Sequence, residues 1–174
     1  MPYDIYRNGR MEGDEPIITV DSDTLAGTDL YQSDLSDADL RKADLSGADL
    51  TDADLSWADL TDADLSDADL TDADLTGADL TGAILPNGET LKQFVEHTVP
   101  RLLTAGGKPL EEVASSGNWA CHSWRNCPIA VAFSTDRATD VPEEHRLNAV
   151  TFIALFDAGL IPQPVTTGDN QDAV

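Results

Sequence analysis

The sequence has few basic residues. It holds 10 Lys and Arg against 33 Asp and Glu, which gives a formal net charge of −23. Binding to nucleic-acid phosphates depends on clustered Lys and Arg, and docking on anionic lipid depends on the same charges. The composition therefore argues against direct nucleic-acid binding and against recruitment to an anionic membrane surface.

Long apolar runs and cysteines are also scarce. No stretch approaches the ~18 consecutive apolar residues of a transmembrane helix, so we expect no membrane span. Residues 1–8 lack a basic region followed by an apolar core, so we expect no signal peptide. Two cysteines cannot make a disulfide framework, and allow at most one bridge or part of one metal site.

What the sequence does contain is a repeat with a period of five residues. Leucine recurs at every fifth position from Leu25 to Leu85, thirteen times without interruption. Alanine stands two residues before each leucine from Ala38 to Ala83, and aspartate directly precedes the leucine in eleven successive units, from Asp29 to Asp79. So long a repeat indicates one structural unit per five residues.

This period fits neither an α-helix, where every fifth residue rotates by about 140°, nor a flat strand, where odd spacing alternates faces. It fits a square solenoid in which each unit makes one side and a corner. Leucine and the alanine two before it then point inward, and aspartate points outward. Residues twenty apart should stack about 4.8 Å apart, and the repeat should complete roughly three coils.

The units ADLSG, ADLTD, ADLSD and ADLTG resemble the A(D/N)LXX motif of the pentapeptide-repeat family over residues 25–85. The resemblance implies a right-handed quadrilateral β-helix with four units per coil, a β-solenoid fold. It implies little about function, because the repeat serves in many contexts.

The period divides the chain into four parts. Residues 1–22 form an N-terminal segment and cap, with a short strand at Ile17–Val20. Residues 23–86 form the β-helix, 87–163 a small α-helical domain, and 164–174 a polar tail. Helices are predicted over 90–105 with a kink at Pro100, over 109–115, over 126–134, and from Val141 to Phe156 with closure at Gly159. The apolar face of the last helix is predicted to consist of Leu147, Val150, Ile153, Ala154 and Phe156.

Most of the acidity lies on the repeat. Residues 21–85 carry a net charge of −16, whereas residues 86–174 carry −5. Neighbouring outward carboxylates repel by about 1 kcal/mol per pair in a water-like dielectric, and molar salt, with a Debye length of about 3 Å, removes much of this repulsion. This favours adaptation to high salt. Aspartate before leucine belongs to the motif, so the independent support is aspartate at the free positions: Asp37, Asp52, Asp62, Asp67 and Asp72.

The family resemblance implies a second interpretation, mimicry of DNA, because some pentapeptide-repeat proteins are acidic inhibitors of gyrase. The charge over three coils matches B-DNA, which carries one charge per about 1.7 Å. Three coils imitate less than one turn of DNA, however, and nothing in the sequence indicates the long dimeric rod of those inhibitors.

Large side chains at outward positions are candidate interaction residues. Tyr31 and Trp57 stand among the aspartates, and Trp57 should stack between Asp37 and Gly77, since Gly77 leaves room for a large ring. Ile84 interrupts the outward aspartates, which suggests that the last coil packs against the chain beyond residue 86. Trp124 is a fourth candidate. The competing interpretation is scattered surface variation, or packing against the chain's own termini.

Cys121, His122 and Cys127 lie within seven residues and permit several interpretations. Zinc needs four ligands, and an adjacent Cys-His pair has poor geometry for it. A thiol nucleophile at Cys127 with His122 as base lacks a third orienting group. Cys121 and Cys127 could also form a disulfide or remain a buried, unreactive pair of thiols, and the buried pair is favoured. We therefore expect no catalytic residue and no cofactor beyond K⁺ or Na⁺ counter-ions.

The block NWACHSWRNCPIAVAF with FIALFDAGLIP is similar to a C-terminal module in pentapeptide-repeat and other small proteins of bacteria, archaea and their tailed viruses. With the charge, this favours a non-enzymatic structural or protein-interaction protein of a halophilic system, a capsid-surface or tail component of a haloarchaeal virus. The expected partner is another protein, such as a virion protein, or a second copy of the chain. The competing hypotheses are a DNA-mimic inhibitor and a thiol- or zinc-dependent enzyme.

Overall fold

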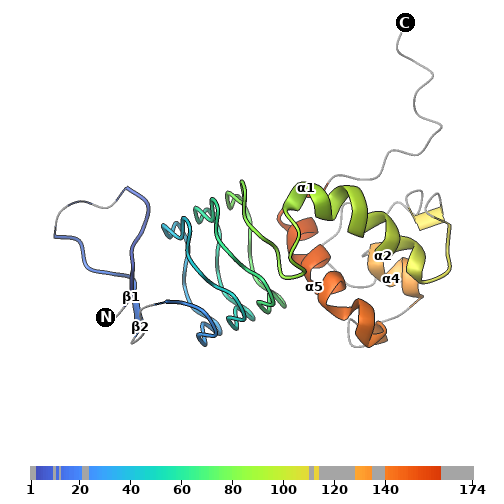
Figure 1. The fold of residues 1–174 in the computed structure, drawn as a ribbon, viewed down its shortest axis with the longest axis horizontal. Coiled ribbons are helices and arrows are strands. Elements are labelled where there is room, and N and C mark those ends of the chain that lie inside the picture. Colours follow the sequence, from blue (N-terminus) through green and yellow to red (C-terminus); the bar gives the residue numbers. More distant parts are fainter. Residues whose placement is uncertain are drawn as a thin grey trace, which may run out of the picture.

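The fold is described from a computed structural model, which describes residues 3–9, 11, 13–20, 24–109, 112–113, 128–134 and 140–161. Three parts succeed one another along an elongated molecule (Figure 1): an N-terminal hairpin, a stack of coils and a group of helices. The hairpin pairs β1 (Tyr3–Ile5) with β2 (Ile18–Val20). The helices are α1 (Leu91–Gln93), α2 (Val99–Ala105), α4 (Pro128–Phe133) and α5 (Glu143–Asp157).

The repeat folds as a β-solenoid with the predicted twenty-residue offset. Parallel bridges join residues twenty apart, from Asp29–Asp49 to Asp64–Ile84. In a typical rung, the Leu50 N–H donates to the Asp69 carbonyl at 2.9 Å, and the Asp69 N–H donates to the Ala48 carbonyl at 3.0 Å. Each coil thus satisfies the backbone groups of its neighbour, as in any sheet.

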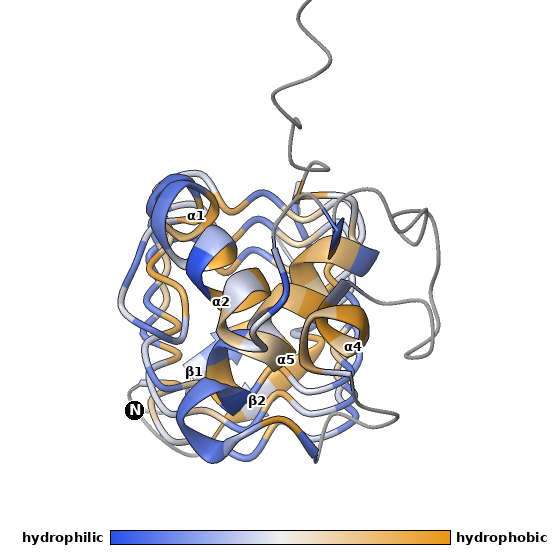
Figure 2. Cartoon of the chain, turned by 90° about the vertical axis from the view of Figure 1, so that its right-hand side faces the viewer, coloured by the Kyte–Doolittle hydropathy of each residue, from blue (hydrophilic) through white to orange (hydrophobic). Residues whose placement is uncertain are grey.

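The interior of the solenoid is dry and made almost wholly of leucine and alanine. Every repeat leucine from Leu25 to Leu85 is at most 5% exposed, and every alanine from Ala38 to Ala83 is at most 7% exposed. The view along the solenoid shows apolar and polar residues alternating along each coil (Figure 2). Burial of this column is the principal hydrophobic stabilisation of the coils.

The corners impose a backbone requirement that the period alone did not reveal. The residue two places after leucine has a positive φ, between 54° and 75°, at each corner from Gly27 to Gly82. Glycine adopts this left-handed conformation freely, and aspartate is among the few other residues enriched there. The five aspartates Asp37, Asp52, Asp62, Asp67 and Asp72 occupy such corners. The prediction that these positions are free was therefore wrong, and their aspartates are weaker support for high-salt adaptation than expected.

The N-terminal segment packs on the first coil. The predicted strand is present as β2, and β1 pairs with it in antiparallel register, with Ile5 opposite Ile18. Beyond β1, the Asn8 N–H donates to the Asp37 carbonyl at 2.6 Å and the Tyr6 carbonyl accepts from Asp39 at 2.8 Å. Ile5 is 1% exposed and joins the leucine core. This segment therefore covers part of the first coil's open edge.

The first helix is continuous but changes pitch. Thr90 and Gln93 form a capping box ahead of α1, a π-helical segment η1 (Phe94–Thr98) comes next, and α2 completes the helix. Pro100 has no N–H and its ring would crowd the carbonyl four residues earlier, so a wider turn before it relieves the conflict. The kink predicted at Pro100 takes the form of this π-helical segment.

The helices close the far end of the solenoid. Phe94, Leu103, Phe152 and Leu155 are fully buried and belong to the same cluster as the repeat leucines. Helix α5 ends at Asp157 and is closed, as predicted, by Gly159, whose φ is +73° and whose N–H donates to the Phe156 carbonyl at 2.9 Å. None of the helices in the described part of the chain is both long and apolar enough to span a bilayer.

The predicted buried face of α5 is only partly confirmed. Ala154 is buried as predicted, and Val150, Ile153 and Phe156 are half-buried, but Leu147 is 38% exposed. Ala149, Phe152 and Leu155, which were not predicted, are also buried. Apolar residues surround most of the second half of this helix, so their spacing alone did not single out one face.

Candidate interaction surface

The aspartate before each leucine has a structural role as well as a charge. All eleven, from Asp29 to Asp79, accept a hydrogen bond through Oδ1 from the backbone N–H two residues later, at 2.8–3.4 Å. This is the Asx-turn geometry by which aspartate fixes a local turn. The carboxylates that coat the solenoid are thus held in place by the corners they precede.

Neighbouring hydroxyls lower the pKa values of several of these carboxylates. The Ser46 hydroxyl donates to Asp44 Oδ1 at 2.6 Å, and this bond and the Ser46 N–H lower the pKa of Asp44. The hydroxyl and N–H of the residue two places later likewise lower the pKa values of Asp34, Asp49 and Asp79. Bonds to the ionised form favour it, so these side chains stay ionised to a lower pH than an ordinary aspartate.

Trp57 stands out from this acidic wall. Its side chain is 64% exposed and its backbone has φ of +61°. The indole lies against Gly77 one coil later, since a Cβ at Gly77 would stand 2.7 Å from Trp57 Cε3. A bulky residue in the left-handed region is a rare and strained conformation, of a kind that clusters at functional sites. The exposed ring is therefore attached to a constrained backbone. As expected, it packs into the space that glycine leaves at position 77.

Two other candidates lie in different environments. Tyr31 is 50% exposed, and desolvation together with the nearby Asp52 carboxylate raises the pKa of its phenol. Ile84 is half-buried, and its backbone bridges both Asp64 of the previous coil and Thr90 ahead of α1. Tyr31 thus belongs to the exposed wall, whereas Ile84 lies where the chain leaves the solenoid.

Two arginines are held by carboxylates of the wall. Arg41 pairs with Asp39 at 2.7 Å and with Asp59 at 3.7 Å. Arg7 reaches from the N-terminal segment to Asp34 at 3.2 Å, and it also donates to the hydroxyl and carbonyl oxygens of Ser36. Nothing in the period of the sequence indicated the Arg7 contacts, because they join segments 27 and 29 residues apart.

The predicted candidates Cys121, His122, Trp124 and Cys127 lie outside the described residues, so their arrangement stays a prediction. Among the residues that the structure describes, no three His, Cys, Asp or Glu side chains gather as a metal site would require.

The solenoid matches a known family model. The family model of pentapeptide repeats matches residues 24–56 and 48–86, with eight copies. Residues 24–86 are pentapeptide repeats. The match ends at residue 86, so the helices C-terminal to the pentapeptide repeats lie beyond it.

Solved pentapeptide-repeat structures resemble part of the chain. A protein of the Arabidopsis thaliana thylakoid lumen is 42% identical over 37% of this chain and 48% of its own, with a TM-score of 0.33. Rfr23 from the cyanobacterium Cyanothece 51142 is 40% identical over 33% of this chain and 40% of its own, with a TM-score of 0.33. HetL from Nostoc sp. strain PCC 7120, involved in heterocyst differentiation regulation, is 38% identical over 37% of this chain and 35% of its own, with a TM-score of 0.24. The chain thus spans less than half the length of each of these three proteins. No curated protein sequence matches it.

Proposed function

We propose that the chain is a non-enzymatic interaction protein whose acidic wall around Trp57 binds a protein partner. The observation that supports this most directly is the exposed indole, held on a strained left-handed corner and packed on Gly77. Exposed aromatic anchors are typical of residues that dominate binding energy at interfaces.

The chemistry of the wall indicates the kind of partner. Trp57 lies three residues after Asp54 in the sequence. Asp54 belongs to a column of outward aspartates, Asp34, Asp54 and Asp74, which stack one coil apart. A partner surface with arginine or lysine would pair with these carboxylates and place a cation over the indole face. We propose a basic protein surface as the ligand, and association would then weaken as salt rises.

The scaffold for this surface is proposed to be a right-handed quadrilateral β-helix of about three coils. The twenty-residue offset between bridged residues, four units of five, supports four sides per coil. We also retain the division into an N-terminal cap, a repeat segment, a helical domain from residue 87 and a polar tail as a proposal.

Photocrosslinking tests the surface. A crosslinking amino acid replaces Asp37, one coil before Trp57, in one variant and Asp67 in another, so that both variants keep the indole. Both positions are exposed left-handed corners, but they lie two sides apart on the coil. We expect position 37, and not position 67, to crosslink one basic protein from the native source, identified by mass spectrometry. Equal crosslinking from both positions would contradict a specific surface.

A more specific proposal is that the chain belongs to a halophilic system and is part of a haloarchaeal virus particle. It is supported by 25 Asp against 3 Lys and by the net charge of −5 on residues 86–174, outside the repeat. Co-purification of the chain with virions at molar salt is the expected result, and its recovery only as free protein would contradict this placement.

Mimicry of DNA is a separate candidate, favoured by the net charge of −16 that residues 21–85 carry. It predicts inhibition of gyrase supercoiling at equimolar protein. Unchanged supercoiling at a salt concentration where the chain is folded would eliminate this candidate.

A further inference from the structure

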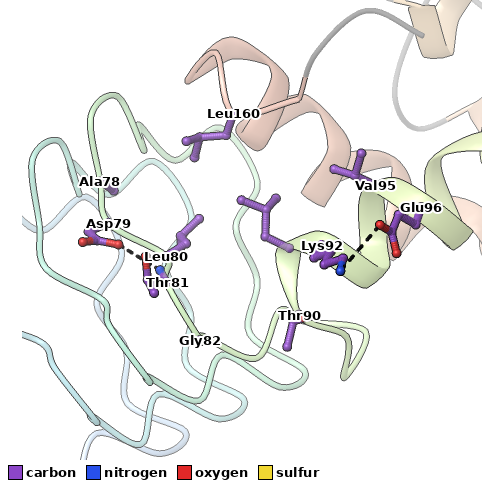
Figure 3. Close-up of a pocket in the computed structure, with 11 residues that line it drawn as sticks. Ala78, Asp79, Leu80, Thr81, Gly82, Thr90, Lys92, Val95, Glu96 and Leu160 are labelled. Atoms are coloured by element: carbon purple, nitrogen blue, oxygen red, sulfur yellow. Dashed lines mark hydrogen bonds and ion pairs between the residues drawn. The ribbon is translucent and has the colours of Figure 1, made fainter. Parts of the chain in front are cut away.

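A groove lies between the last coil and the helices (Figure 3), with a volume of about 640 Å³. One wall is the coil segment Ala78–Gly82, and the other consists of Thr90, Leu91, Lys92, Val95, Glu96 and Leu160. Its volume falls within the ~300–1,000 Å³ of typical ligand pockets. The groove therefore has room for side chains of a bound segment.

Within the described part of the chain, the coil wall of this groove is a strand edge without a backbone partner. In the previous coil, the equivalent N–H groups of Leu60 and Asp62 donate to the carbonyls of Asp79 and Thr81, each at 2.9 Å. In the last coil, the N–H groups of Leu80 and Gly82 and the carbonyl of Ala78 have no such backbone partner among the described residues. Unpaired edges of this kind are templates for a further strand.

We propose that an extended segment of a partner protein adds to this edge as a parallel strand. The register follows from the way the last coil pairs with the previous one. There the Asp79 carbonyl accepts from the Leu60 N–H, and the Asp79 N–H donates to the Ala58 carbonyl, each at 2.9 Å. The central residue of the partner segment accepts from the Leu80 N–H and donates to the Ala78 carbonyl. The carbonyl two residues later accepts from the Gly82 N–H. Main-chain bonds thus provide affinity, as in other cases of strand addition.

This register fixes the chemistry of the partner segment. The central residue of the partner segment stacks on Asp79, just as Asp79 stacks on Asp59. An acidic residue at this position would therefore bring two like charges together. A lysine or arginine there pairs instead with the carboxylate of Asp79, which lines the groove. The residues on either side face Ala78 and Leu80 and the apolar side chains of Leu91, Val95 and Leu160. The segment therefore reads small apolar, basic, large apolar.

The site is independent of the proposed Trp57 surface. It uses the backbone edge of the last coil and the side chains of the helices, and no atom of the indole. A failure of the strand-addition experiments would leave the Trp57 proposal untouched, and the reverse also holds.

The backbone register is tested with blocked peptides carrying a central Ala-Lys-Leu, measured by NMR shifts of the Leu80 and Gly82 amides. N-methylation of the lysine removes the donor to Ala78 and should weaken binding about tenfold. N-methylation of the next residue, leucine, is the matched control, because that N–H points away from the edge, and should change binding less than about twofold. Equal losses from both, or no binding of the unmodified peptide, would overturn the proposal.

The charge pair is tested by a double-mutant cycle. Asp79→Asn keeps the acceptor for the Thr81 N–H but removes the charge. We expect this variant to bind the lysine peptide several-fold more weakly and to bind a norleucine peptide unchanged. Equally weakened binding of both peptides would show that the Asp79 carboxylate does not pair with the basic residue. A matching melting temperature would show that the variant is folded.

Two other occupants are distinguished by the same assay. If the chain's own β-branched residues Val165, Thr166 and Thr167 filled the edge, replacing them by Gly, Ser and Gly would tighten peptide binding at least about tenfold. If a second copy filled it, sedimentation would show a dimer that the peptide dissociates. Either result would overturn a partner-protein occupant, whereas unchanged affinity and a monomer support it.

Discussion

At the residue scale, the corner backbone decides which side chains the solenoid tolerates. Glycine and aspartate fill nine of the corners from Gly27 to Gly82, and Gln32, Lys42 and Trp57 occupy the others. The last three carry side chains that gain nothing from the left-handed conformation, so a contact made by the side chain has to offset the strain. For Trp57, part of that contact is the stack on Gly77.

Gly77→Ala tests this stack. The new methyl would meet the Trp57 ring at 2.7 Å, in addition to the strain of alanine at φ +71°. Gly47→Ala is the matched control, with φ +65° and nothing within 4 Å. We expect the control to lose about 1 kcal/mol of unfolding free energy and Gly77→Ala at least about 1 kcal/mol more. In a Trp57→Gly background, Gly77→Ala should cost no more than the control, measured by urea unfolding against the Trp57→Gly variant alone.

Ser46→Ala tests the bonds that hold the carboxylates. The folded-state pKa of Asp44 lies below its ordinary value, so this group contributes stability above pH ~4 that is lost as the pH falls through the folded pKa. Removing the hydroxyl should raise the Asp44 pKa in an NMR titration. It should also reduce the loss of stability as the pH falls from about 5 to about 3, a range that brackets the ordinary aspartate pKa of ~3.9. Ser46→Thr keeps the hydroxyl and should behave as the parent. An unchanged pKa in Ser46→Ala would contradict the role of this bond.

At the element scale, the coil is the unit that the sequence specifies best. The leucine period fixes which residues are buried, and it predicted the twenty-residue stacking, because each position repeats the same environment. The helices were predicted less well, because the ring of Pro100 acts through the preceding turn and because apolar residues surround much of α5. The contacts of Arg7 and the left-handed corners had no signal in hydrophobic period alone.

Leu55→Ala measures what one coil position contributes. Leu55 is fully buried between neighbouring coils, so the cavity should lower the unfolding free energy by about 2–5 kcal/mol. Leu147→Ala, on the exposed side of α5, should cost no more than about 0.5 kcal/mol. Calorimetry of both variants provides the comparison, and similar melting temperatures would contradict a dry leucine column.

At the scale of the whole molecule, charge and fold oppose each other. The repeat concentrates a net −16 on one solenoid, and the carboxylates that carry much of this charge also accept the hydrogen bonds of its Asx turns. Screening should therefore act on folding, because the Debye length falls from about 10 Å at 0.1 M salt to about 3 Å at 1 M. The same concentration of charge leaves the apolar groove beside Leu160 as a local exception on the surface.

The salt dependence of stability tests this balance. We expect the melting temperature to rise steeply with NaCl between about 0.1 and 1 M. A variant with Asn at the five aspartate corners, Asp37, Asp52, Asp62, Asp67 and Asp72, is the control, since Asn tolerates the same backbone without the charge. Its salt dependence should be shallower. Parallel curves for both proteins would show that repulsion at the corners does not limit stability.

The offset between bridged residues has a consequence for how such a chain can change length. Inserting twenty residues of the repeat would move the terminal helices outward by about one strand spacing, ~4.8 Å, and leave them facing the same way. If the coil has the four sides proposed above, inserting five residues would turn the helices to the adjacent side, together with the groove. Duplication of the repeat can therefore tune the reach of the two ends separately from their mutual orientation.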